Sequence, residues 1–241
     1  MLDKLDVKQD SKPESLSASS TSEGMAAMSD ALGDLDSSKV IYGMRHGQTS
    51  LDVAKRCDGW VDLDLSDEGE QGVVATLSDY LQAIPFTQII SPDFIRTTTT
   101  AHIVKSGLPS DPEVVIDNDM KTWNIGTISG DKKTSDRKTF VKYLISHPEI
   151  HSPDGESYNE FTERFDAFIH EQMGRIKSGK LKGPILDMFS GSCLRRLGEL
   201  INGDRDSLDV KESGLIMLYP DGKKWSAVLI ASPDEEGNEI S

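Results

Sequence analysis

The sequence predicts an α/β fold, a three-layer α/β/α sandwich around a mostly parallel sheet. Short apolar stretches alternate with amphipathic ones between residues 40 and 201. This alternation is typical of strands that are connected by helices. The apolar stretches run into loops rich in Gly, Ser and Pro, as buried strands do. The last two apolar stretches flank a turn sequence, which predicts an antiparallel hairpin at one edge.

Six segments are expected to be strands because each is short, apolar and bounded by turn-forming residues. They are 40–44, 87–90, 114–116, 184–189, 215–219 and 225–230. The last two flank Pro220-Asp221-Gly222-Lys223, which favours a tight turn.

Helices are expected between the strands. One begins at Ser66, a cap-type residue followed by two acidic residues, and its apolar residues recur four positions apart. A second follows the strand that ends near residue 90 and carries Arg96. The clearest helix is 158–176, which has an apolar stripe at helical spacing, and 193–201 is a fourth.

The chain divides into a leader, a folded domain and a short tail. Residues 1–38 hold nine serines, eight acidic residues and three lysines, with no aromatic residue, which predicts a disordered segment. Its simpler interpretation is a solvated leader or a misassigned start, and its alternative is a docking arm. The domain is expected over 39–231, with 131–156 as an insertion that covers one end of the sheet. The tail, 232–241, carries four acids and no base.

Composition excludes several classes of protein. The 241 residues include 26 basic and 41 acidic side chains, a formal charge of −15, which argues against an electrostatic nucleic-acid binder. No apolar run approaches the roughly 18 residues of a membrane span, and the N-terminus has no apolar signal region, so a cytoplasmic location is expected. The two cysteines, Cys57 and Cys193, are far apart, so neither a disulfide scaffold nor a cysteine zinc site is expected.

Three predicted strand ends carry groups suited to an anion. The first is Arg45-His46-Gly47-Gln48-Thr49, which combines an arginine fork, a nucleophilic histidine and a glycine that allows close approach. The second is Arg96, and the third is Ser190-Gly191-Ser192 before a helix N-terminus. Ligands of open α/β sheets bind at the carboxyl ends of the strands, so these groups are expected to converge on one phosphate-sized site.

Further motifs follow in a set order. Gly59-Trp60-Val61-Asp62 leads to Leu65-Ser66 and Gly69, Ser91 leads to Arg96 and Thr100-Ala101, and Gly155-Glu156-Ser157 precedes Arg164. Together with the motif at 44–49 they cover about residues 39–230. This order resembles the histidine phosphatase superfamily, also called phosphoglycerate-mutase-like.

The resemblance implies phosphoryl transfer without a metal or other cofactor. His46 would attack phosphorus and become phosphohistidine, and the ligand would be a phosphorylated small molecule or an inorganic anion. The residues expected to bind it are Arg45, Gln48, Thr49, Arg96 and Gly191.

Three positions depart from the family pattern. Ser190 stands where the family has a second histidine, Thr122 where it has the glutamate that donates a proton, and Asp52 where it has an asparagine. Losing a general acid costs roughly 10²–10⁴ in rate, and losing a charge-stabilising donor on the order of 10²–10³.

These departures favour a degenerate domain that keeps a phosphate pocket, is weak or inactive, and acts in anion binding or in assembly with a protein partner through its acidic tails. The alternative is an active phosphomonoester phosphatase or mutase in which Asp52, or a residue of 131–156, donates the proton. A purely structural role is a third hypothesis. Two arginines kept beside His46 count against it, because uncompensated charges in a concave site are costly.

Overall fold

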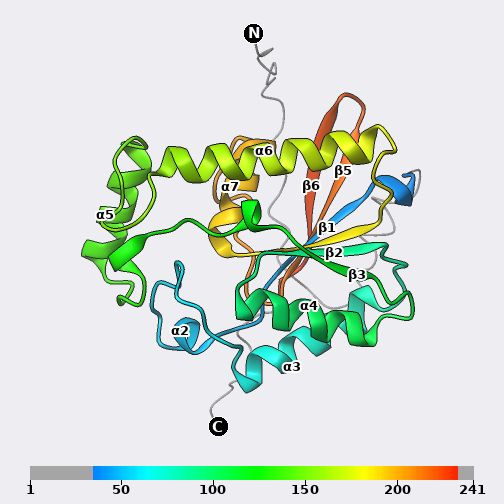
Figure 1. Cartoon of the computed structure of the whole chain (residues 1–241), viewed down its shortest axis with the longest axis horizontal. Coiled ribbons are helices and arrows are strands. Elements are labelled where there is room, and N and C mark those ends of the chain that lie inside the picture. Colours follow the sequence, from blue (N-terminus) through cyan, green and yellow to red (C-terminus); the bar gives the residue numbers. More distant parts are fainter. Residues whose placement is uncertain (1–34, 233–241) are drawn as a thin grey trace.

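The computed structural model describes residues 35–232, which form a six-stranded sheet with helices on both faces (Figure 1). The strand order is β3-β2-β4-β1-β5-β6. The strands are β1 Ile41–Arg45, β2 Gln88–Ser91, β3 Glu113–Ile116, β4 Ile185–Phe189, β5 Leu215–Asp221 and β6 Lys224–Ala231. The first four pair in parallel, whereas β5 is antiparallel to β1 and to β6. The predicted mostly parallel sheet and its closing hairpin are confirmed.

The ends of the chain lie largely outside the described residues. Expectations for 1–34 and 233–241, including docking through the acidic tails, fall there and stay predictions. Of the expected leader, residues 35–38 are described. Ser37–Lys39 form a 3₁₀ turn, η1, and the carbonyl of Ser38 accepts a hydrogen bond from the Gly183 amide at 2.7 Å. The fold therefore begins a few residues before position 39.

Helices cover both faces of the sheet. α3 (Asp67–Thr76) and α4 (Ile95–Gly107) lie on one face, and α6 (Tyr158–Lys177) and α7 (Gly191–Asn202) lie on the other (Figure 1). α3 continues through a π-helical turn, η2 (Leu77–Leu81). The remaining elements are three short ones, α2 Ser50–Val53, η3 Asn118–Met120 and η4 Gly126–Ile128, and the helix α5 Ser135–Ser146.

Side-chain alternation along the strands separates the two halves of the core. In β1, Ile41 packs with the α6–α7 side, whereas Tyr42 and Met44 pack with the α3–α4 side. Strands that are covered on both faces are rich in apolar residues, and β1 up to Met44 and β4 apart from Asp187 fit this pattern, since all of these residues are buried.

α6 is the helix that the sequence predicts most clearly. Ser157 and Glu160 form a reciprocal capping box at its start. Phe161 and Phe165 stack on each other, with ring centroids 5.9 Å apart, and both are fully buried against the sheet. The apolar stripe at helical spacing therefore faces the core.

One carboxyl group lies inside this core. Asp187 of β4 is fully buried and accepts a hydrogen bond of 3.0 Å from Nε2 of Gln172 on α6. Burial raises the pKa of Asp187 to about 8, so the group carries a proton near neutral pH.

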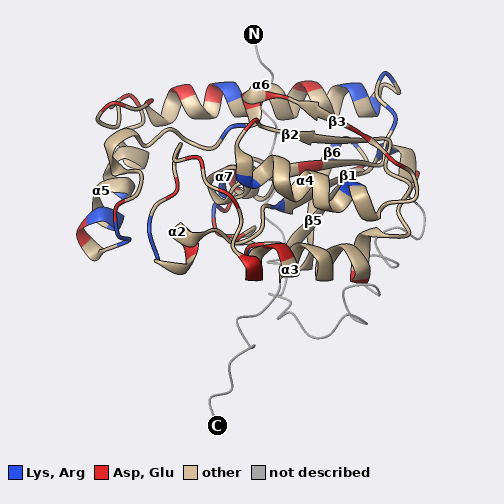
Figure 2. Ribbon diagram, turned by 60° about the horizontal axis from the view of Figure 1, so that its bottom comes forward, with Lys and Arg blue, Asp and Glu red and all other residues tan. Residues whose placement is uncertain are grey.

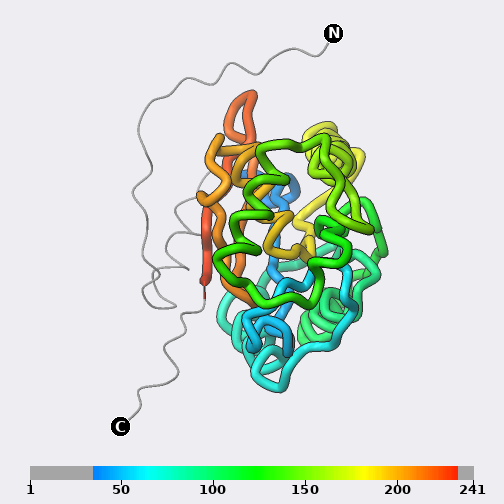
Figure 3. Tube along the Cα trace, turned by 90° about the vertical axis from the view of Figure 1, so that its left-hand side faces the viewer, coloured from blue at the N-terminus to red at the C-terminus, as the bar shows by residue number. Residues whose placement is uncertain are grey.

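The insertion at 131–156 contains α5. Thr134 caps this helix by accepting a hydrogen bond from the Arg137 amide, and Leu144 is its one buried residue. α5 lies at the end of the sheet where β1 and β4 finish, and Figure 3 looks onto that end, with the green segment in front of the strands.

None of the helices within residues 35–232 combines the length and the apolar character that crossing a membrane requires.

Candidate functional site

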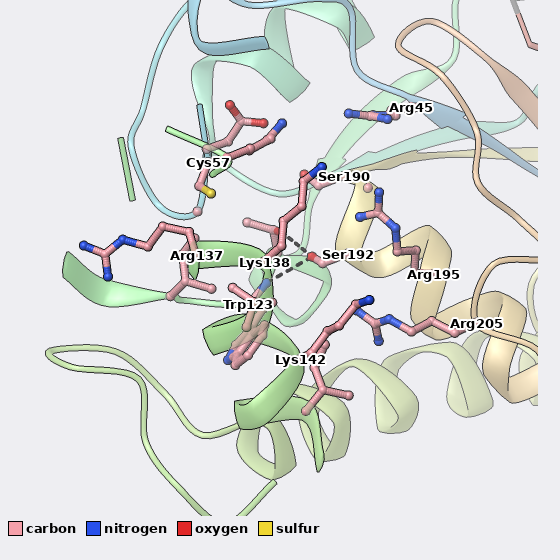
Figure 4. Close-up of a pocket in the computed structure, with 18 of the residues that line it drawn as sticks. Arg45, Cys57, Trp123, Arg137, Lys138, Lys142, Ser190, Ser192, Arg195 and Arg205 are labelled. Atoms are coloured by element: carbon pink, nitrogen blue, oxygen red, sulfur yellow. Dashed lines mark hydrogen bonds between the residues drawn. The ribbon is translucent and has the colours of Figure 1, made fainter. Parts of the chain in front are cut away.

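A cavity of about 420 Å³ lies between the carboxyl ends of the parallel strands and α5 (Figure 4). Three separate segments reach it, as the sequence predicts: Arg45 at the end of β1, Arg96 in the first turn of α4, and Ser190-Gly191 at the start of α7. Thr122, from the loop after η3, also lines it. Five of the nine predicted site residues are therefore brought to one cavity.

The other four do not line this cavity. Thr49 is the N-cap of α2, and its hydroxyl accepts a hydrogen bond from the Asp52 amide. The Asp52 carboxylate accepts a hydrogen bond from the Thr49 amide at 3.0 Å, which completes a capping box. Oε1 of Gln48 accepts a hydrogen bond from the Ser66 hydroxyl at 3.1 Å. In this structure Gln48, Thr49 and Asp52 therefore shape the loop behind the cavity.

His46, the fourth, is 1% exposed and is not among the residues that line the cavity. Its Nδ1 is 2.8 Å from the carbonyl oxygen of Gly47. Because a carbonyl can only accept, Nδ1 carries the proton and Nε2 is unprotonated. Burial, reinforced by the Arg96 and Arg45 guanidinium groups, lowers the pKa of His46 to about 3, so the ring is neutral at physiological pH.

Both arginines of the cavity donate hydrogen bonds to backbone carbonyl groups. Nη1 of Arg45 donates to the Val210 carbonyl at 2.8 Å, and its Nη2 pairs with the Glu212 carboxylate and lies 3.7 Å from Asp52. Arg96 donates to the carbonyls of Val61 and Gly59, at 2.8 and 3.0 Å. In both residues Nε is buried without a hydrogen-bond partner among the described residues.

Ser190 and Thr122 are the two residues that the sequence analysis expects at the positions of the family's second histidine and acid. Ser190 is 5% exposed, and its hydroxyl has no hydrogen-bond partner in the described part of the chain. The Thr122 hydroxyl pairs with that of Ser192 (Figure 4). Hydroxyls can donate to an oxyanion, but they are too weakly acidic to protonate a leaving group near pH 7.

Two carboxyl groups near the cavity differ in their acidity. Burial opposes the ionisation of Asp52, yet its hydrogen bonds from Thr49 and the Arg45 guanidinium keep the pKa of Asp52 below its ordinary value. Asp58, which the sequence reasoning missed, does line the cavity. Burial, with a contribution from the nearby charge of Asp52, raises the pKa of Asp58 from 3.8 to about 6. Of the two, Asp58 is the one able to exchange a proton near neutral pH.

The cavity is also lined by more positive side chains than the sequence reasoning identified. Its eight basic lining residues are Arg45, Arg96, Lys133, Arg137, Lys138, Lys142, Arg195 and Arg205. Only two acidic residues, Asp58 and Asp206, line it. Three of the eight, Arg137, Lys138 and Lys142, belong to α5, which carries blue positions in Figure 2. The dense run of Lys and Arg between 132 and 142 was the available signal.

Within the described residues, no cluster of three or more His, Cys, Asp or Glu side chains is arranged to hold a metal ion.

Comparison with known proteins agrees with this geometry. Residues 41–213 match the model of the histidine phosphatase superfamily, branch 1. The chain belongs to this superfamily. It is 28% identical over 133 residues to a probable phosphoglycerate mutase, GpmB, of Escherichia coli O1:K1 / APEC, a match that covers 54% of this chain and 60% of that protein. The aligned part thus spans less than two thirds of that relative.

Solved structures show the same histidine phosphatase fold. A phosphoglycerate mutase from Bacillus anthracis str. Sterne aligns with a TM-score of 0.66 at 21% identity, over 79% of this chain and 91% of that one. A putative alpha-ribazole-5'-P phosphatase from Escherichia coli str. K-12 substr. MG1655 aligns with a TM-score of 0.63 at 18% identity, over 81% and 98%. At these identities the likeness establishes the fold alone.

Proposed function

We propose that this histidine-phosphatase domain binds a phosphate-type anion at the inner end of the cavity and hydrolyses phosphomonoesters weakly or not at all. One observation supports the binding. Nε of Arg45, Nε of Arg96 and the Ser190 hydroxyl are buried without partners among the described residues, and all three residues line the same cavity. An unsatisfied buried polar group costs about 1–3 kcal/mol, so an oxyanion that accepts from these donors would relieve that cost.

Weak turnover is expected because the residues around the bound anion lack a proton donor of the usual kind. Thr122 replaces the acid that the family uses, and Ser190 replaces its second histidine, so proton donation and one positive charge are both lost. Glu212 and Asp52 also compete with a ligand for Arg45. Loss of a general acid alone costs roughly 10²–10⁴ in rate, which takes a typical turnover of about 10 s⁻¹ down to 0.1 s⁻¹ or less.

Sulfate binding, measured by calorimetry, tests the anion site. Ser190→Asp keeps a good N-cap for α7 but adds a negative charge, so we expect this variant to fold and to lose sulfate binding. Ser190→Ala removes one donor and should weaken binding about three- to tenfold. Equal sulfate affinity in the wild type and in Ser190→Asp would refute the proposed site.

A second candidate function, an active phosphomonoesterase, is favoured by the orientation of His46. Its neutral ring, with Nδ1 bonded to the Gly47 carbonyl, leaves Nε2 available as a nucleophile. Asp58 is then a better candidate than Asp52 for the proton donor, since it lines the cavity and its pKa is raised to about 6.

Hydrolysis of p-nitrophenyl phosphate separates the two functions. The first proposal expects turnover no faster than about 0.1 s⁻¹. Turnover near the typical value of about 10 s⁻¹ that disappears in His46→Ala, falls at least tenfold in Asp58→Asn and leaves acid-labile phosphate on His46 would overturn it in favour of the phosphatase.

A further inference from the structure

Helix α4, whose first turn carries Arg96, begins without a cap from its own sequence. Its N-cap residue, Phe94, makes no side-chain hydrogen bond, and its first turn contains no acidic residue. The amide groups at the start of a helix need acceptors, which Ser, Thr, Asp or Asn at the N-cap normally supplies. Here the carboxylate of Asp62 takes that role from another part of the chain, since its Oδ1 accepts a hydrogen bond of 2.7 Å from the Ile95 amide. Asp62 therefore caps α4 at the residue just before Arg96.

The side chain of Arg96 is bound by the same short stretch of chain, residues 59–62, here called the 59–62 segment. Nη1 of Arg96 donates to the Val61 carbonyl at 2.8 Å, and Nη2 donates to the Gly59 carbonyl at 3.0 Å. The segment thus contacts α4 at two points, the backbone just before Arg96 and the far end of its side chain. These contacts fix the orientation of the guanidinium, whose Nε has no partner in the described part of the chain.

The 59–62 segment is itself attached to other parts of the site. Nε1 of Trp60 donates to the Thr122 carbonyl at 2.8 Å. The Trp60 ring packs edge-on against that of Phe94, and the Arg96 guanidinium lies over the Phe94 ring, with Cζ 4.4 Å from its centroid. Gly59 has a φ of +48°, and a Cβ built there would collide with Oγ of Ser129. Packing and backbone conformation therefore define the path of the segment, and Asp62 joins it to α4.

The charge of Asp62 has the opposite consequence for a bound anion. Burial lowers the pKa of Arg96, and the negative charges of Asp58, Asp62 and Asp52 oppose that shift. The charge of Asp62 also repels an anion at Arg96 and offsets the positive end of the α4 dipole. Removal of this charge would by itself strengthen anion binding. A loss of affinity when the side chain is removed would therefore reveal its geometric role.

We propose that Asp62 is a positioning residue for the anion site: by capping α4, it holds Arg96 and the 59–62 segment in the arrangement that binds the ligand. This inference rests on the proposed anion site. Asp62 is exposed and does not line the cavity, so it acts only through Arg96. The Gly59-Trp60-Val61-Asp62 motif thereby receives a role, which is to fix a buried arginine from outside the cavity.

Sulfate calorimetry on three variants tests this role. Asp62→Ala removes the cap, so the donors of Arg96 lose their alignment, and we expect sulfate affinity to fall at least about fivefold although a negative charge is lost. Asp62→Asn keeps an acceptor for the Ile95 amide and loses only the charge, so its affinity should stay within about twofold of the wild type or exceed it.

Asp64→Ala is the matched control. Asp64 is also exposed, and it accepts a hydrogen bond of 3.0 Å from the Thr99 hydroxyl of α4, one turn beyond Arg96. This variant removes the same charge and another contact with α4, yet it should not weaken sulfate binding. An affinity of Asp62→Ala that equals or exceeds that of the wild type overturns this inference, and so does an equal loss in Asp62→Asn. A lower midpoint of chemical denaturation without a loss of affinity would make Asp62 a structural residue only.

Failure of the anion site itself has a different signature, because the wild type would then not bind sulfate or would not respond to Ser190→Asp. The position of Arg96 can in that case be followed by hydrogen exchange of its Nε–H in NMR spectra, with Arg96→Lys to assign the signal. The buried Nε–H should be protected in the wild type and in Asp62→Asn, and it should exchange at least about tenfold faster in Asp62→Ala. Equal protection in all three proteins overturns the positioning role.

Discussion

Replacing Asp58 by Asn tests whether anion affinity in this cavity depends on a carboxyl group that titrates near pH 6. Asp58 lines the cavity, so its negative charge opposes a bound dianion. The neutral form of Asp58 should therefore be the form that binds. Sulfate is the suitable probe because it stays a dianion across the range, whereas the second pKa of phosphate esters is itself about 6.

The magnitude follows from the pKa of Asp58 and from the charges around it. Burial is the main cause of the rise to about 6, and the charge of Asp52 adds to it, whereas Arg96, Lys133 and Arg45 oppose it. If only the protonated form binds, the apparent dissociation constant of sulfate rises about tenfold from pH 5 to pH 7 and about tenfold again to pH 8. These values are upper limits, since the ionised form retains some affinity.

The assay is sulfate titration by calorimetry at pH 5, 6, 7 and 8 and constant ionic strength. Asp58→Asn should show a nearly flat profile and bind sulfate up to about tenfold more tightly than the wild type at pH 7. Asp206→Asn, which removes the other lining carboxylate, should keep the pH dependence of the wild type. The reasoning is refuted if Asp58→Asn retains the wild-type slope, because another group would then be titrating.

Three further predictions concern the core, the chemistry and the competing carboxylates. Burial raises the pKa of Asp187 to about 8, so the folded state holds a proton that the unfolded state releases near pH 4. The free energy of unfolding should therefore fall as the pH rises from about 4 to about 8, by up to about 1.4 kcal/mol per pH unit. Chemical denaturation of Asp187→Asn should show that slope flattened, and an unchanged slope would contradict the assignment. The double variant Ser190→His/Thr122→Glu restores the residues typical of the family and should hydrolyse p-nitrophenyl phosphate at least tenfold faster than the wild type. A double variant no faster than the wild type would show that these two residues do not limit turnover. Glu212→Gln should tighten sulfate binding about three- to tenfold by releasing Arg45, as followed by calorimetry, and unchanged affinity would show that the two do not compete.

The sequence was sufficient for the fold because each element carries a local signal. β1 is a short apolar run that ends at Arg45, and α6 carries its capping residues and its stripe in one continuous segment. Segment 131–156 was harder to interpret. The segment is polar apart from a short apolar patch within 140–145, so its pattern does not predict a helix, yet it forms α5 over 135–146 with Thr134 as the N-cap.

The candidate site was predicted only in part, since its properties arise between segments. One cavity is lined by Arg45, Arg96 and Ser190. This could be predicted because each of them follows a predicted strand, and the carboxyl ends of parallel strands lie at the same edge of a sheet. Asp58 lines the cavity, whereas the buried His46 is not among the lining residues. This difference depends on packing, which the spacing of the residues in the sequence does not reveal.

The charge of the cavity also depends on how separate segments pack, and the sequence alone does not reveal it. A chain with a net charge of −15 argues against binding a polyanion when only the total is considered. Acidic residues, however, gather elsewhere, as in the first turn of α3, where Asp67, Glu68 and Glu70 favour the helix N-terminus. Basic residues of α5 (Arg137, Lys138 and Lys142) and of α7 (Arg195) instead line one cavity at the ends of the strands. Under the proposed function, a cavity that lacks the proton donor typical of the family but is lined by eight basic residues has the electrostatics of a binding site. This is why its affinity for an anion, more than its turnover of a monoester, should distinguish it from an ordinary phosphatase.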